Sequence, residues 1–233
     1  SCAGVALVTA GAAGIGAAIA DGYRAAGWAV YVCDVELAAI EAFRRERPEV
    51  GASQADVSDP EAAAKVVDNV IERFGRLDVL VNNAGVAGPT GPIEELEPEA
   101  LRRCLDVNIG GAFFFAAHAA KVMKAAGRGA IISIASNAAL FGFPYRAPYA
   151  ASKWALIGLT KTLAMELGPF GVRVNAICPG SVEGPRIDAV IERDAAARGV
   201  SPDEVRATYE RQSSMQTFAR AEDIAQMCVY LSS

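Results

Sequence analysis

Short apolar runs alternate with longer helical segments along this chain. The apolar runs predict six strands, at residues 4–9, 29–34, 51–56, 77–82, 129–136 and 172–178. The longer segments predict helices near residues 15–26, 36–47, 60–74, 98–126 and 149–168. The strand runs are continuously apolar, which is typical of a sheet covered by helices on both faces. This order predicts an α/β fold with one doubly wound parallel sheet in three layers, α/β/α.

Residues 183–215 interrupt this rhythm after the sixth predicted strand. They are charged and weakly apolar. We interpret them as two short helices that form a lid over a substrate, with a solvated surface excursion as the alternative. No linker or repeat divides the sequence, so a single catalytic domain over residues 1–233 is expected, with 183–215 as an insertion.

Composition narrows the class of protein. The chain has 233 residues, of which 52% are hydrophobic and 21% charged, enough for a large core. Its net charge is −5 without a basic block, so nucleic acid is not an expected partner. The apolar stretch 5–20 contains glycines and lacks a basic leader, so it fits a strand, turn and helix better than a signal peptide or membrane span. We therefore expect a cytoplasmic protein that does not enter a membrane.

The five cysteines do not suggest a disulfide framework or a metal site. Their number is odd and no CxxC pair occurs. Reduced, apolar packing residues are the expectation, and no metal is expected because no ligand cluster supports one.

Unusual residues follow each predicted strand. In an open parallel sheet, ligands bind beyond the carboxyl ends of the strands. Those ends carry, in chain order, TAGAAGIG (9–16), Asp34, Asp56, NNAG (82–85), Ser136 and Cys178-Pro179-Gly180. Any one of these is explained by turn chemistry, but six at one edge of a sheet predict a binding site.

The first of these clusters fits a dinucleotide. Gly14-Ile15-Gly16 opens a helix directly after a strand, so backbone N–H groups and the positive helix end can face a pyrophosphate. Asp34 lies 18 residues beyond Gly16, near the spacing of an acid that binds the adenosine ribose. A carboxylate there repels a 2′-phosphate and no basic residue follows at once. NAD is therefore favoured over NADP.

Together these motifs resemble the short-chain dehydrogenase/reductase (SDR) family over essentially the whole chain. The residues that carry the resemblance are Thr9 to Gly16, Asn82 to Gly85, Asn108, Ser136, Tyr149, Lys153, Pro179 and Gly180. Two positions depart from the family pattern: Ala10 stands where the first glycine of the loop is usual, with Gly11 beside it, and Gly184 stands where many members carry a threonine that contacts the nicotinamide.

The resemblance implies a Rossmann-type fold and an NAD-dependent oxidoreductase that moves a hydride between nicotinamide and a secondary alcohol or ketone. Tyr149 is then the general acid/base. Ser136 would hydrogen-bond the same substrate oxygen. Lys153 would hold the nicotinamide ribose, and Asn108 would anchor a water that relays protons to Lys153. For Asn108, a kink-site residue that bonds to helix backbone is the alternative. The implied cofactor-binding residues are Gly11, Gly14, Ile15, Gly16, Asp34, Asp56, Val57, Asn83, Ala84, Gly85, Tyr149, Lys153, Pro179, Gly180 and Val182.

Simple electrostatics supports the pairing of Tyr149 with Lys153. The two are one helical turn apart and so share a helix face. A free tyrosine has a pKa of about 10. An ammonium about 4 Å away, at an effective dielectric of about 20, favours a phenolate by about 4 kcal/mol. An ordinary exposed pair is the alternative, and Ser136 with the strand-end pattern argues against it.

Two other functions stay open. A 3-oxoacyl thioester reductase is one, although Asp34 counts against the NADP that this role more often uses. The other is a non-catalytic nucleotide-sensing or scaffold module. We expect the substrate pocket to be lined by residues 137–145 and 183–215, including Phe141, Phe143 and Arg186. Arg146 and Arg186 allow an acidic or sugar-like substrate, or are exposed charges.

The remaining expectations concern packing and assembly. Trp28 and Trp154 are expected to be packing residues, and His118 a packed or interface residue. The resemblance implies that Asp56 and Val57 contact adenine, and Asp59 is expected to cap the next helix. The long apolar helices 98–126 and 149–168 predict a homodimer or homotetramer. The sequence ends in a predicted helix where the family adds a seventh strand, so we expect it to be trimmed at both ends.

Overall fold

Six parallel strands form one sheet in the computed structural model, which describes residues 2–233. The strand order across the sheet is β3-β2-β1-β4-β5-β6, and every neighbouring pair is parallel. The strands are β1 (Val5–Thr9), β2 (Ala29–Asp34), β3 (Gly51–Gln54), β4 (Val79–Asn82), β5 (Gly129–Ile134) and β6 (Val172–Ile177). The chain begins at the middle of the sheet, winds outward to β3 and returns to β4. This confirms the predicted doubly wound sheet, with its switch point between β1 and β4.

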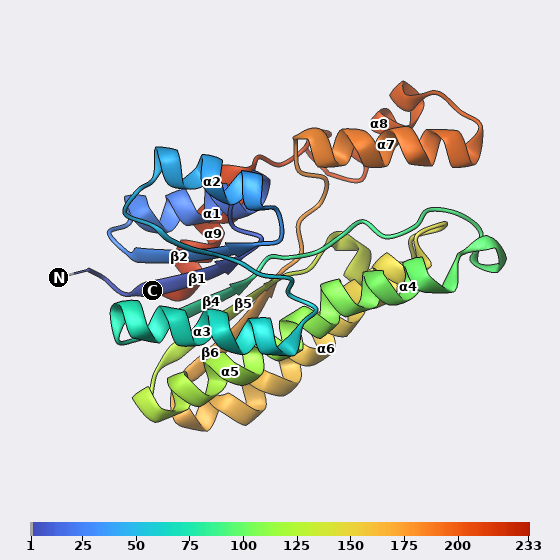
Figure 1. The fold of residues 1–233 in the computed structure, drawn as a ribbon. Helices are drawn as coiled ribbons and strands as arrows, with labels where there is room; N and C mark the ends of the chain where they lie inside the picture. The colour runs from blue at the N-terminus through green and yellow to red at the C-terminus, as the bar shows by residue number, and fades with distance from the viewer. Residues whose placement is uncertain (1) are drawn as a thin grey trace.

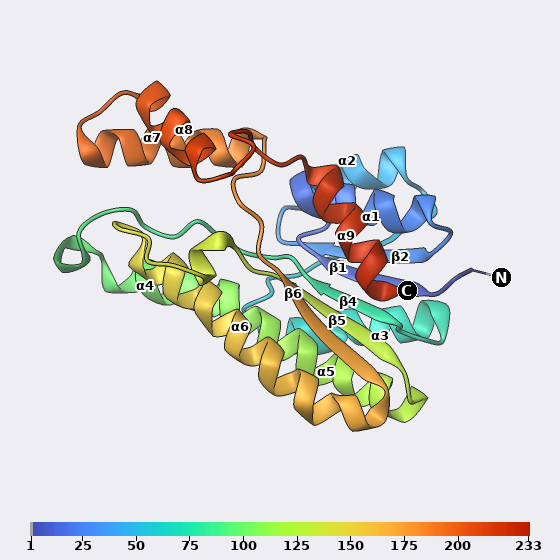
Figure 2. The ribbon, with the colours of Figure 1, turned by 180° about the vertical axis from the view of Figure 1, so that it is seen from behind.

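Helices cover both faces of the sheet (Figures 1 and 2). Ala6 and Val8 of β1 pack with one set of helices and Val5 and Leu7 with the other. The first set is α1 (Gly14–Ala25), α2 (Leu37–Glu46) and α9 (Ala221–Ser232), and the second is α3 (Pro60–Phe74), α5 (Gly111–Ala126) and α6 (Ala147–Leu167). Apolar residues on both sides of each strand are therefore the cause of the continuous apolar runs in the sequence.

The predicted helix 98–126 is not one regular helix. It consists of α4 (Pro98–Leu105), a π turn (Asp106–Gly110) and α5. The extra residue of the π turn lies just before Gly111, where a Cβ atom would come within 2.9 Å of the Val57 side chain. Gly111 thus allows α5 to approach the loop after β3, and helical periodicity alone does not reveal the π turn.

Residues 183–215 do contain two helices, α7 (Pro185–Arg198) and α8 (Pro202–Arg211). They form a small core of their own, made of Val190, Ile191, Ala195, Val205, Tyr209 and Phe218. Within that core the buried Asp194 accepts a hydrogen bond from the Tyr209 hydroxyl at 2.6 Å and pairs with Arg198 at 3.0 Å. The alternative of a solvated excursion is therefore wrong. Figure 2 shows the two helices projecting beyond the carboxyl ends of the strands.

The packing predictions were only partly correct. Trp28 packs edge-to-face on Tyr23, with ring centroids 5.5 Å apart, as expected. Trp154 is 51% exposed, so the prediction that it packs inside is wrong for this chain by itself. His118 is half-buried on α5, and Asp59 caps α3. All five cysteines are free; three are buried, Cys178 is half-buried, and Cys2 is exposed and so is not a packing residue.

The helices of residues 2–233 can be compared with the helix that a membrane span requires. None of the helices in the described part of the chain combines the length and the apolar character that a bilayer crossing requires. No seventh strand occurs within residues 2–233, where α9 follows the lid helices and packs against α1.

Candidate active site

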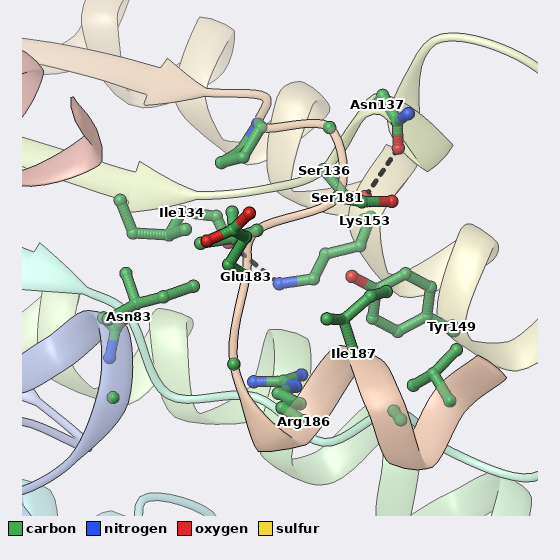
Figure 3. A pocket seen from close by; sticks show the side chains of 18 of the residues that line it. Asn83, Ile134, Ser136, Asn137, Tyr149, Lys153, Ser181, Glu183, Arg186 and Ile187 are labelled. Atoms are coloured by element: carbon green, nitrogen blue, oxygen red, sulfur yellow. Dashed lines mark hydrogen bonds between the residues drawn. The ribbon is translucent and has the colours of Figure 1, made fainter. Parts of the chain in front are cut away.

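A cavity of about 480 Å³ opens at the carboxyl ends of the strands. Its walls come from the loop after β1, the ends of β2 and β5, the start of α6, and the segment from Pro179 to Gln212. Figure 3 shows part of this lining, with Ser136, Tyr149 and Lys153 around one side of the space. The structure therefore brings most of the predicted site residues together from segments far apart in the sequence.

The loop between β1 and α1 is tightly packed on itself and on the loop after β4. A Cβ atom on Gly16 would lie 2.0 Å from the Ala10 carbonyl oxygen and 2.7 Å from Asn83 Nδ2, so no other residue fits there. Ala10 has φ 48°, a left-handed conformation that costs an L-residue about 1 kcal/mol. Ala10 therefore has a left-handed backbone at the position where the family usually has a glycine.

Hydrogen bonds hold this loop from two sides. Asn83 Nδ2 donates to the Thr9 carbonyl oxygen at 3.0 Å and to the Ala10 carbonyl oxygen at 3.1 Å. The Thr9 hydroxyl oxygen accepts from the Asn83 and Ala84 backbone N–H groups, both at 3.0 Å. The role of Asn83 and Ala84 in the described structure is therefore to fix the loop after β4 against the glycine loop.

The start of α1 can accept an anion. Its N-cap is Ala13, no side chain caps the helix, and its first turn contains no acidic residue. The positive helix end therefore faces the cavity without a competing carboxylate. Asp34, at the end of β2, also lines the cavity, and its carboxylate accepts from the Ala12 backbone N–H at 3.2 Å.

Tyr149 and Lys153 lie on the first two turns of α6 and both line the cavity. Lys153 is 3% exposed. Its ammonium donates to the Ile134 carbonyl oxygen at 2.8 Å and lies 5.7 Å from the centroid of the Tyr149 ring. Burial, and to a smaller extent the positive charge of Arg186, lowers the pKa of Lys153 to about 7. The exposed-pair alternative is therefore wrong for Lys153.

Ser136 lies two residues beyond the end of β5 and lines the same cavity. Its hydroxyl donates to Asn137 Oδ1 at 3.2 Å and accepts from the Ala138 backbone N–H at 3.2 Å. Figure 3 shows Ser136 near Lys153 and on the same side of the cavity as Tyr149. The three groups from β5 and α6 are thus oriented toward one space.

Asn108 is buried at the π turn and does not line the cavity. Its Nδ2 donates to the Val86 carbonyl oxygen and to the Ser152 hydroxyl, both at 3.0 Å, and its Oδ1 accepts from Val86 N–H at 2.7 Å. The Ser152 hydroxyl in turn donates to the Tyr149 carbonyl oxygen at 2.7 Å. Asn108 therefore joins the loop after β4 to the helix that carries Tyr149. The predicted water relay stays a prediction.

Several predicted cofactor residues lie outside the cavity lining, and their assignments stay predictions. Asp56 pairs with Arg103 at 3.0 Å, and Val57 packs under Gly111. Gly85 lies behind the site, where an added Cβ would be 3.2 Å from Asn108 Oδ1 and 3.5 Å from Lys153 Nζ. The other two outside the lining are Gly11 and Ala84. Pro179, Gly180 and Val182 do line the cavity.

On the substrate side, the lining includes Phe143, Arg146 and Arg186, all named from the sequence, but not Phe141. Phe143 stacks on Tyr209, with ring centroids 6.0 Å apart, whereas Phe141 is 43% exposed and outside this lining. Arg146 is 3% exposed and lines the wall, so its description as an exposed charge is wrong. Gly184 has φ 135°, which suits glycine and explains the missing threonine. Within residues 183–215, which the sequence analysis gave as a range, the lining also includes Ile187, Val190, Tyr209 and Gln212.

Metal ligands do not gather in this region. Within residues 2–233, no three His, Cys, Asp or Glu side chains are close enough together to hold a metal ion.

Comparison with known proteins places this geometry in a family. The family model described as short chain dehydrogenase matches residues 4–195. Cis-4-hydroxycyclohexanecarboxylate dehydrogenase of Sinomonas cyclohexanicum is 34% identical over 98% of this chain and 89% of that protein. Trans-4-hydroxycyclohexanecarboxylate dehydrogenase of the same organism is 49% identical over 130 residues. That match covers 56% of this chain and 49% of the other protein.

Solved structures are similar over nearly the whole chain. NAD+-bound xylitol dehydrogenase matches with a TM-score of 0.93 and 30% identity, over 98% of this chain and 92% of the other. Actinorhodin polyketide ketoreductase with NADPH matches with a TM-score of 0.93 and 34% identity, over 98% and 90%. The chain therefore belongs to the short-chain dehydrogenase family of oxidoreductases.

Proposed function

We propose that this protein interconverts a secondary alcohol and the corresponding ketone, with NAD as the hydride carrier and Tyr149 as the general acid/base. The observation that carries the proposal is that Ser136, Tyr149 and Lys153 line the same cavity as the glycine loop and Asp34. One cavity thus offers both a nucleotide cradle and a proton-transfer group. The resemblance to dehydrogenases that act on CH–OH groups supports the same conclusion.

The residues present fit a dinucleotide. Gly14 lines the cavity and has open space beside its Cα, so a ligand can approach the backbone there. The uncapped start of α1 suits a pyrophosphate. Asp34 on β2 lies three strands from Tyr149, which follows β5, a span of about 14 Å. An extended dinucleotide bridges such a span. Bound NAD supplies a nicotinamide carbon that accepts or donates a hydride.

The charge at Asp34 favours NAD over NADP. Its carboxylate would repel a 2′-phosphate, and the residues that follow, Val35 and Glu36, bring no positive charge. The similar structures in this family carry either cofactor, NAD+ in one and NADPH in another. For this chain the preference therefore rests on Asp34.

In the oxidation direction, the Tyr149 phenolate takes the proton of the substrate hydroxyl. The Ser136 hydroxyl turns from Asn137 Oδ1 to the substrate oxygen and stabilises the charge that develops on it. Lys153 favours the phenolate of Tyr149 by its positive charge. The apolar wall of Phe143, Ile187 and Val190 packs against the carbon skeleton of the substrate and excludes water.

Steady-state kinetics of the wild type and Tyr149→Phe, with NAD and NADP and a panel of cyclic and linear secondary alcohols, tests the proposal. We expect turnover in the variant to fall at least a thousandfold while the NAD dissociation constant changes less than threefold, because the phenol oxygen moves the proton. We also expect kcat/KM with NAD to exceed that with NADP. Full activity in Tyr149→Phe would disprove the mechanism, and better use of NADP would disprove the role of Asp34.

The same experiment tests two other functions. The ketoreductase likeness favours a 3-oxoacyl thioester reductase as second candidate; turnover of a 3-oxoacyl thioester with NADPH, and not of the alcohols, would establish it. Cofactor binding without turnover of any compound would identify a nucleotide-sensing or scaffold module.

We further propose that residues 183–215 act as a lid over the substrate, that the protein is cytoplasmic, and that copies associate through α5 and α6 into a homodimer or homotetramer. Phe113 on α5 is 52% exposed, and Trp154 and Met165 on α6 are 51% and 80% exposed. The two helices lie side by side on one face (Figure 1). Such exposed apolar side chains on neighbouring helices support a surface that another copy covers.

A further inference from the structure

We propose that the substrate carries a carboxylate, that Arg186 binds this carboxylate at the start of α7, and that Arg146 adds a fixed positive charge in the wall beside Tyr149. The inference rests on the proposed function, because it assigns a substrate class to the same cavity. It depends on two guanidinium groups that neither the cofactor cradle nor the proton transfer uses.

The charge of the cavity differs from that of the whole protein. The chain has a net charge of −5, yet the cavity lining has more cationic than acidic side chains: Arg146, Lys153 and Arg186 against Asp34 and Glu183. Asp34 belongs to the β2 end of the cavity, three strands from the strand that leads to Tyr149. The substrate end is therefore a local positive site in an acidic protein, and it favours an anionic ligand.

Arg186 is the group placed to contact that anion. It occupies the second position of α7, after Gly184 and Pro185, and no side chain caps this helix. Asp188, the acid of the first turn, pairs instead with Arg206 of α8. Across residues 2–233, no ion pair or side-chain hydrogen bond involves the Arg186 guanidinium. The positive end of α7 and the Arg186 guanidinium therefore both attract an anion.

Arg146 is a second, independent observation that favours an anionic ligand. It is 3% exposed, and its guanidinium lies 4.8 Å from the centroid of the Tyr149 ring. One terminal nitrogen donates to the Ala87 carbonyl oxygen at 2.9 Å, while the buried Nε has no partner among the described residues. A buried, incompletely paired guanidinium is costly unless an anion lies near it. Its place in the lining makes the substrate that anion.

The cofactor's phosphates are the other source of negative charge. The glycine loop and the start of α1 already provide a phosphate site beside β1. Arg186 instead lies next to Ile187 and near Val190 on α7, the helix of the apolar substrate wall, and Figure 3 shows it beside Ile187 and below the Lys153 amine. Glu183 lines the same cavity, but no ion pair in the described chain joins it to Arg186. We therefore assign Arg186 to a substrate carboxylate.

Binding of ligands that cannot react separates this inference from the chemistry. Calorimetry on the wild type saturated with NAD would compare cyclohexanecarboxylate with cyclohexanecarboxamide, and butyrate with butyramide. Within each pair the size is the same and only the charge differs. We expect at least one acid to bind ten- to a hundredfold more tightly than its amide. No preference for the acid in either pair would overturn the proposal.

Substitution of Arg186 gives the second arm. Arg186 is exposed, so Arg186→Met is expected to fold normally. We expect the variant to lose the preference for acid over amide, Arg186→Lys to keep part of it, and Arg193→Met, an exposed position farther along α7, to keep all of it. For a carboxylate-bearing alcohol, Arg186→Met should raise KM at least tenfold with little change in kcat.

The same variants distinguish a failure of the carboxylate proposal from a failure of the proposed reaction. If Arg186→Met weakens NAD binding to the same extent, the guanidinium serves the cofactor's phosphates and the proposal is wrong. Tyr149→Phe should keep the acid preference while losing turnover. Loss of turnover in Tyr149→Phe together with no acid preference in the wild type would leave the proposed reaction intact and disprove only the carboxylate.

Discussion

Lys153 shows how burial acts on a single side chain in this site. Its ammonium is almost fully covered, has one hydrogen bond to the Ile134 carbonyl oxygen, and lies near the positive charge of Arg186. Burial of a charge at this place lowers the pKa of Lys153 to about 7, from 10.5. The position that suits Lys153 for tuning Tyr149 is therefore destabilising for the folded protein.

We expect Lys153→Met to be more stable relative to wild type at pH 6 than at pH 9. Below the folded pKa of Lys153, the folded and unfolded states both hold the proton, and the folded state bears the whole cost of the buried charge. Between the folded and unfolded values only the unfolded state holds it, so wild-type stability rises with pH. The advantage of the variant should shrink by about 2–3 kcal/mol between pH 6 and pH 9.

Urea unfolding of the cofactor-free proteins at both pH values measures this difference. Lys161→Met, an exposed position on the same helix, should show no such pH dependence. A constant difference between Lys153→Met and wild type would contradict the lowered pKa of Lys153. Turnover of Lys153→Met should be low at either pH.

At the scale of the element, the π turn before α5 has a clear structural purpose. It places Asn108 where one amide satisfies both backbone groups of Val86 and also bonds Ser152. The loop after β4, which has no regular structure between Asn83 and Pro92, is thus attached to α6. An α-helix through 98–126 would turn this side chain elsewhere.

We expect Asn108→Ala to lower the free energy of unfolding by about 2–4 kcal/mol, because three hydrogen bonds are lost: two to the partly buried backbone groups of Val86 and one to the buried Ser152 hydroxyl. The melting temperature should fall by roughly 5–12 °C, measured by calorimetry or circular dichroism. Asn69→Ala is the matched control, since Asn69 makes one partly buried bond to Ser53. An unchanged melting temperature in Asn108→Ala would show that these bonds contribute nothing to stability.

At the scale of the whole molecule, one face of the sheet carries two long neighbouring helices with large exposed side chains. Phe113, Trp154 and Met165 together present apolar surface that a second copy would remove from water. Since the sequence predicted the packing of Trp154 and the described chain leaves it half exposed, a contact between copies would account for both.

We expect sedimentation velocity and light scattering to show a dimer or tetramer, and Trp154→Glu to raise the dissociation constant at least tenfold, because a charge would be buried in the interface. Leu37→Glu, at a 51% exposed position on α2, should leave the assembly unchanged. A wild-type monomer at all concentrations, or an unaltered Trp154→Glu assembly, would exclude this interface.

Much of the fold and of the site could be read from the sequence because the signals are local. Continuous apolar runs such as Val5–Val8 indicate strands covered on both faces, and this was confirmed. The glycine loop, Asp34, Ser136 and the Tyr149–Lys153 pair stand at strand ends or one helical turn apart, and topology alone places them at one edge of the sheet.

What the sequence by itself determined is therefore the family, the sheet and the positions of the proposed reacting groups, since each depends on spacing along the chain. The tertiary structure decided which charges are buried and what faces them: the lowered pKa of Lys153, the covered guanidinium of Arg146, and the bonds from Asn108 to Val86. These properties depend on contacts between residues tens of positions apart, which no periodicity records. For the same reason, only the structure brings Arg186 of α7 and Tyr149 of α6 into the lining of one cavity.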